Sequence, residues 1–116
     1  MTRQTLHLRL DTPAALAGRA LALAARRLDW RVRPLGEGGL VCHPPHVLFI
    51  GSPAVRVSWR ALDGGSTAVV VSAALHGSSA HHARHLRSLL ELFAEVLPGA
   101  ARQRADATAA PLELAA

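Results

Sequence analysis

The first residues of the chain alternate between apolar and polar side chains. In "TLHLRL" (residues 5–10), the three leucines point to one side and His7 and Arg9 to the other. A period of two is typical of a β-strand with one buried face. After "DTP" the period lengthens, and alanines and leucines recur at helical spacing opposite arginines. The pattern predicts a strand followed by a helix over residues 13–28.

Four more strands are predicted before a second helix. Apolar or alternating segments occur in "DWRVRPL", in residues 40–50, in "AVRVSWRAL" and in "STAVVVSAAL", and glycine-rich turns separate most of them. Alternation is most regular in "AVRVSWRAL", which places Trp59 on the buried side and Arg60 on the other. Leucines at helical spacing then predict a second helix, which ends at the Pro98-Gly99 pair.

The predicted order of elements is β-α-β-β-β-β-α. Short turns between successive strands indicate antiparallel pairing, and the first strand is expected to pair with the last. This order predicts an α+β fold, a two-layer sandwich in which a five-stranded, antiparallel-rich sheet carries both helices on one face. We expect a single domain over residues 1–98 and a flexible Ala/Pro-rich tail over residues 99–116.

The order of elements is similar to one half of the TATA-binding-protein fold, which also occurs in small bacterial domains of unknown function. The stretch "DGGSTAVVVSAALHGSSAHHARHLRSLLELF" resembles the end of one such bacterial domain family, and the likeness covers the pattern of residues 5–97. The resemblance implies a fold and a compact binding module. It implies no catalytic residue.

Composition narrows the cellular setting. The chain of 116 residues has 13 Arg, no Lys and a net charge of +5, which permits an anionic partner without requiring one. The single cysteine, Cys42, cannot form an internal disulfide, as expected in a reducing compartment. No apolar segment is long enough for a membrane helix, and the N-terminus lacks the apolar core of a signal peptide. We therefore expect a cytoplasmic protein with no membrane partner.

The sheet face away from the helices is the predicted binding surface. Alternation assigns to it His7, Arg9, Arg31, Arg33, Arg56, Arg60 and Val70. One of the pairs Leu48/Ile50 or Val47/Phe49 is expected there as well, and apolar side chains beside arginines are typical of an interface. We expect a non-enzymatic module that binds a protein partner, most simply a second copy of itself in a homodimer. A nucleic acid is the alternative partner, although single-strand binding favours exposed aromatic residues and the chain has no Tyr.

Histidines and prolines raise the question of a metal site. Residues 40–50 contain "CHPPH", and more histidines cluster at the start of the second helix. A polyproline conformation would place two histidines on one edge, and helical spacing aligns two others, so that together they could hold zinc, with Cys42 as another ligand. The ligands of such a site would be His43, His46, His81 and His85. Since no established metal-binding spacing is present, a strand that bends at two prolines is the favoured interpretation.

No enzymatic motif is present in the sequence. The chain contains no nucleophile elbow, phosphate-binding loop or dinucleotide fingerprint, and its glycines lie between predicted strands. We therefore expect no catalytic residue and no cofactor.

Overall fold

The computed structural model describes residues 1–45, 53–77 and 80–102. Over these residues it contains six strands and two helices. Their bounds are β1 (Thr2–Leu10), α1 (Ala14–Arg27), β2 (Arg31–Pro34), β3 (Gly39–His43), β4 (Val55–Ala61), β5 (Thr67–Leu75), α2 (Ala80–Glu95) and β6 (Ala100–Arg102). The α+β class is confirmed, and the order of elements up to α2 is the predicted one.

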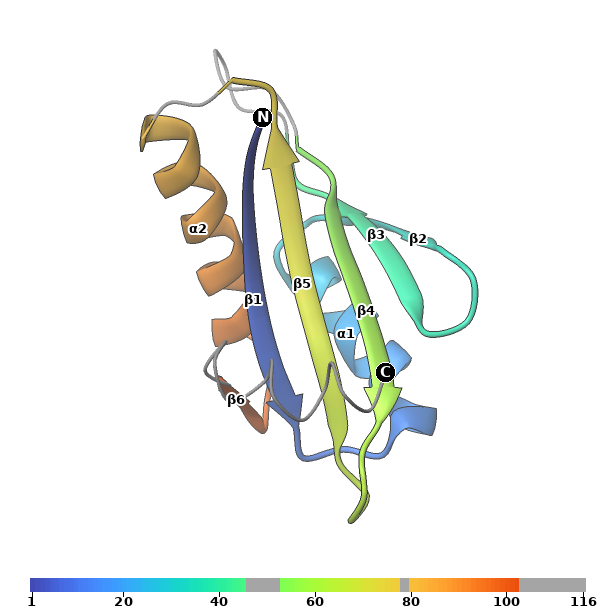
Figure 1. The fold of residues 1–116 in the computed structure, drawn as a ribbon. Helices are drawn as coiled ribbons and strands as arrows, with labels where there is room; N and C mark the ends of the chain where they lie inside the picture. Colours follow the sequence, from blue (N-terminus) through green and yellow to red (C-terminus); the bar gives the residue numbers. More distant parts are fainter. Residues whose placement is uncertain (46–52, 78–79, 103–116) are drawn as a thin grey trace.

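One antiparallel sheet holds all the described strands, in the order β2-β3-β4-β5-β1-β6. The predicted pairing of the first strand with the last of the meander is confirmed, because β1 pairs along its whole length with β5, from Thr2 opposite Leu75 to Leu10 opposite Thr67. Both helices pack on the same face of the sheet (Figure 1), α1 behind β2, β3 and β4, and α2 behind β1 and β5. The other face, here called the outer face, has no described helix over it.

The core lies between the helices and the inner face of the sheet. Alternate residues of β1 point into it (Leu6, Leu8 and Leu10), as do Val55 and Val57 of β4. Helix α2 contributes Leu86, Leu90 and Phe93, all fully buried. The rings of Trp30 and Phe93 stack with their centroids 5.7 Å apart and their planes inclined by 14°. The alternation predicted from sequence thus separates the buried face from the outer face correctly.

The strand predicted over residues 40–50 extends past the observed one at residues 44 and 45, which are described and lie outside any strand. Strand β3 ends at His43, immediately before Pro44 and Pro45, which are not in a strand. Proline has no N–H to donate to the ladder and restricts the residue before it to extended conformations, which explains the boundary. Residues 46–50 lie outside the described residues.

The segment after α2 also differs from the expectation of a tail beginning at residue 99. Residues 100–102 form β6, which pairs antiparallel with β1 so that Leu8 lies opposite Arg102. An ion pair between Arg102 and Glu91 connects β6 to α2. The rest of the expected tail, residues 103–116, lies outside the described residues.

Neither described helix is both long enough and apolar enough to span a membrane.

Candidate functional site

The outer face of the sheet carries all seven residues predicted to bind a partner. Their neighbours along each strand, such as Leu8 beside Arg9 and Val57 beside Arg56, belong to the core. Because successive side chains in a strand point to opposite faces, the predicted residues share the outer face. The five arginines are exposed, whereas His7 and Val70 are half-buried.

The register of the sheet places the arginines on alternate strands. Arg9 of β1 and Arg60 of β4 both lie opposite Ala68 of β5, which is the strand between them. Likewise, Arg56 of β4 and Arg33 of β2 both lie opposite Val41 of β3. Strands β1, β4 and β2 therefore carry the arginines, and the strands between them carry mostly small side chains, with His43 at the end of β3.

Strand β5 forms the middle of this pattern. Its outward residues are Ala68, Val70, Ser72 and Ala74, and together we call them the β5 strip. Arginines stand on both sides of the strip: Arg3 and Arg9 on β1, and Arg56 and Arg60 on β4. Since neighbouring strands are about 4.8 Å apart, the two arginine-bearing strands are separated by roughly 10 Å. Long arginine side chains thus flank the short side chains of the β5 strip.

No carboxylate balances these charges on the outer face of the described structure. Within residues 1–45, 53–77 and 80–102, acidic residues occur only in turns, in loops and on α2, and none lies in a strand: Asp11, Asp29, Glu37, Asp63, Glu91 and Glu95. The outer face carries six arginines, while Arg102, the remaining arginine in a described strand, pairs with Glu91 on the helical side. A face of one sign attracts anions and repels cations.

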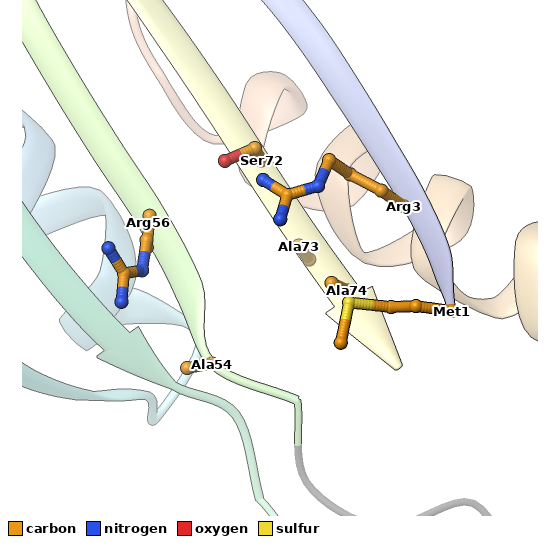
Figure 2. A pocket seen from close by; sticks show the side chains of 7 residues that line it. All are labelled: Met1, Arg3, Ala54, Arg56, Ser72, Ala73 and Ala74. Carbon is orange, nitrogen blue, oxygen red and sulfur yellow. The ribbon is translucent and has the colours of Figure 1, made fainter. Parts of the chain in front are cut away.

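A pocket opens at one end of the β5 strip (Figure 2). Its volume is about 350 Å³, and Met1, Arg3, Ala54, Arg56, Ser72, Ala73 and Ala74 line it. Figure 2 shows the Arg3 side chain extending from β1 over β5 toward Ser72, while Arg56 stands on β4, on the opposite side of Ser72. Ser72 lies directly opposite Arg56 in the register.

The sequence prediction missed Arg3 and Ser72. The predicted strand began at Thr5, whereas β1 begins at Thr2, and the alternation continues backward through the exposed Arg3. Gln4, which lies between Arg3 and Thr5, takes an inward position opposite Ala73. Because Gln4 is polar, the apolar/polar alternation is not visible in the sequence at this end of the strand. Ser72 lies within the apolar segment of β5. Because Val71 and Ala73 on either side of it point into the core, strand alternation could have assigned Ser72 to the outer face.

The apolar side chains expected on the outer face can be checked only at Val70, which lies there and is half-buried. The exposed large apolar side chains among the described residues are Met1, Leu16, Leu23, Leu35 and Leu92. Of these, Met1 borders the outer face at the rim of the pocket, Leu35 directly follows β2, and Leu16, Leu23 and Leu92 lie on the helices. The pairs Leu48/Ile50 and Val47/Phe49 lie outside the described residues. The described outer face is therefore basic, with small side chains between its cations.

The three predicted zinc ligands that the structure describes do not lie together. His43 ends β3 on the outer face, opposite Arg31, whereas His81 and His85 lie on α2, in the helical layer. His46 lies outside the described residues. No group of three or more His, Cys, Asp or Glu side chains suited to a metal ion occurs in the described ranges.

Burial shifts the pKa of both Cys42 and His85. The Cys42 thiol is fully buried in the core, and burial raises its pKa to about 11. Nε2 of His85 is buried and has no hydrogen-bond partner among the described residues. Loss of hydration, and to a lesser extent the charges of His81 and His82, lower the pKa of His85. Both groups therefore favour their neutral forms, and neither faces the arginines.

Comparisons with known proteins assign no family. No protein-family model matches the chain, and no curated protein matches its sequence. The resemblance to one half of the TATA-binding-protein fold stays a prediction.

Proposed function

We propose that this chain is a small non-enzymatic binding module that takes an acidic protein partner on its outer sheet face. The observation that carries the proposal is the alternation of arginine-bearing strands with strands of small side chains. Arginine keeps its charge at all physiological pH values and forms paired hydrogen bonds to carboxylates. The face thus combines fixed positive charge with a low floor that an extended acidic segment could approach.

The same charge distribution argues against self-association through this face. Two copies placed face to face would bring six arginines against six arginines, with no carboxylate among the described strand residues to offset them. Like charges across an interface oppose binding. An acidic surface on a different protein is the complementary partner, and homodimerisation through the outer face is disfavoured.

A nucleic acid is the second candidate, because its phosphates would satisfy the same arginines. The described aromatic side chains weigh against base stacking on this face. Trp30 and Phe93 are buried, and Trp59 packs on the core from the inner side. Such a complex would rest on phosphate contacts and would show little sequence preference.

Charge reversal on two surfaces tests the proposal. A fluorescent oligoglutamate peptide is titrated with the protein at about 0.15 M salt, where the Debye length is about 8 Å, and its anisotropy reports binding. Arg56→Glu/Arg60→Glu changes the outer face, whereas Arg19→Glu/Arg84→Glu changes the net charge equally on the helical side of the molecule. We expect the first pair to weaken binding by about tenfold or more and the second by about threefold or less, because local contacts outweigh long-range attraction at this ionic strength.

Equal losses for the two pairs would show that net charge alone drives the binding and would contradict the proposal. A single-stranded oligonucleotide of matched charge serves as the competing probe. Tighter binding of the oligonucleotide than of the peptide, with the same dependence on Arg56 and Arg60, would favour the nucleic-acid candidate.

A further inference from the structure

The pocket at the end of the β5 strip brings together three hydrogen-bond donors from three adjacent strands. They are the guanidinium groups of Arg3 on β1 and Arg56 on β4, and the hydroxyl of Ser72 on the strand between them. Ser72 lies opposite Arg56, and Arg3 lies opposite Ala74, which is the next outward residue of β5. Arg3 and Arg56 therefore lie on the two strands that flank Ser72, and Figure 2 shows the Arg3 guanidinium over β5 near Ser72 and the Arg56 guanidinium on the β4 side of it.

The floor of the pocket is low. Ala54, Ala73 and Ala74 line it, and the one long apolar side chain among the lining residues is that of Met1, which lies beside Ala74 (Figure 2). None of the lining residues is acidic, and so a bound anion would not compete with a carboxylate of the pocket. A volume of about 350 Å³ is at the lower end of the range for small-molecule sites, roughly 300–1,000 Å³.

The arrangement of the donors distinguishes among oxyanions. A carboxylate is planar, and a single arginine fork can satisfy both of its oxygens. A phosphate group is tetrahedral and carries more charge, so that it can accept hydrogen bonds from two guanidinium groups and a hydroxyl at the same time. Donors placed on two flanking strands and on the strand between them can surround a tetrahedral group, and they therefore match the phosphate better than the carboxylate.

We propose that the pocket lined by Arg3, Ser72 and Arg56 binds the phosphate group of a phosphate monoester. This inference deepens the proposed function and rests on it, since the pocket belongs to the same outer face. A phosphate group is the ligand that we assign to this pocket. Inorganic phosphate offers the same chemistry without the ester, and the two sources are separated in the experiment.

The test is calorimetric titration of the complete chain in a phosphate-free buffer. Inorganic phosphate, O-phosphoserine and acetate are titrated separately. We expect saturable binding of both phosphate probes and at least about tenfold weaker binding of acetate, because acetate uses fewer of the donors. Tighter binding of O-phosphoserine than of inorganic phosphate would identify a monoester, whereas equal or weaker binding would overturn the assignment to a monoester.

Variants locate the binding within the outer face. Arg3→Ala and Arg56→Ala should each weaken phosphate binding by about tenfold, as expected for the loss of a charge-assisted hydrogen bond. Arg3→Lys keeps the charge but removes the fork, and it should also weaken binding. Arg9→Ala and Arg60→Ala are the matched controls: they lie on the same two strands and the same face but outside the pocket. They should change the affinity by no more than about threefold, because their charges are farther from the ligand.

Two further results would overturn the inference. One is the absence of saturable phosphate binding, and the other is an equal loss for Arg60→Ala and Arg56→Ala. The oligoglutamate titration separates this failure from that of the proposed function. If the peptide still binds and depends on Arg56 and Arg60, only the phosphate pocket is refuted; if neither probe binds, both proposals are refuted.

Discussion

The indole ring of Trp59 lies against Gly18, where α1 closely approaches β4. A Cβ atom built on Gly18 would lie 2.8 Å from Cζ2 of Trp59 and 3.3 Å from Cη2. The first distance is too short for two carbon atoms in ordinary contact. The absence of a side chain at Gly18 thus allows a large ring to pack between the helix and the sheet.

Gly18→Ala should destabilise the protein, although alanine is the better helix former. In an unobstructed helix the change would stabilise by up to about 1 kcal/mol. Here the added methyl group must displace the indole ring, and overpacking of this kind costs about 1–3 kcal/mol. Chemical denaturation should therefore show a net loss of stability. The same change in a Trp59→Leu background should be neutral or stabilising, and a loss of equal size in both backgrounds would contradict the steric explanation.

Phe93 and its sequence neighbour Leu92 should respond very differently to truncation. Phe93 is fully buried and stacks on Trp30, whereas Leu92 is 42% exposed on α2. Phe93→Ala should lower the free energy of unfolding by about 3–5 kcal/mol, and Leu92→Ala by less than about 1 kcal/mol. Urea denaturation of the two variants checks this. Similar losses would mean that α2 is rotated about its axis relative to the described packing.

The stability of the protein should decrease as the pH falls below about 6.5, in part because of His85. Burial and the neighbouring histidines lower its pKa in the folded state, while the unfolded chain keeps a value near 6.5. The unfolded state therefore binds the proton more readily, so that protonation favours unfolding. This contribution is fully present above the unfolded pKa and is lost as the pH falls through the folded one. His85→Gln should flatten the fall in melting temperature between pH 7.5 and 5, and a steeper fall would refute this assignment.

Cys42 should be unreactive toward thiol reagents in the folded protein at pH 8. The thiolate is the reactive form, and a pKa of about 11 leaves almost none of it at that pH. The side chain is also fully buried. Labelling by a disulfide reagent should proceed only through opening of the structure and should become rapid in denaturant. Rapid labelling of the native protein would show that β3 is accessible where the structure buries it.

Much of the architecture follows from local patterns that the sequence displays directly. Alternation decides which side chains share a face, and this period alone assigns Arg9, Arg56 and Arg60 to the same side of the sheet. The hairpin between β4 and β5 then places Arg56 opposite Ser72 and Arg60 opposite Ala68. Gly64 and Gly65 adopt φ values of +82° and +81°, which glycine tolerates at tight turns and which help to fix the register.

Other features depend on contacts that no local pattern reveals. Strand β6 is only three residues long, "AAR", and is held by pairing with β1 and by the ion pair from Arg102 to Glu91. The pocket arises because β1 extends back to Thr2 beside β5, which places Arg3 across the strip from Arg56. Such neighbours are set by tertiary pairing, since the residues concerned are far apart in the chain.

The most direct test of the central claim is methyl NMR of three consecutive valines during titration with the oligoglutamate peptide. Val70 lies on the outer face in the β5 strip, whereas Val69 and Val71 on either side of it point into the core. If the partner binds the outer face, the Val70 methyl signals should shift progressively while those of Val69 and Val71 stay in place. Shifts confined to the core valines or to Leu16 and Leu23 of α1, with Val70 unchanged, would contradict the account.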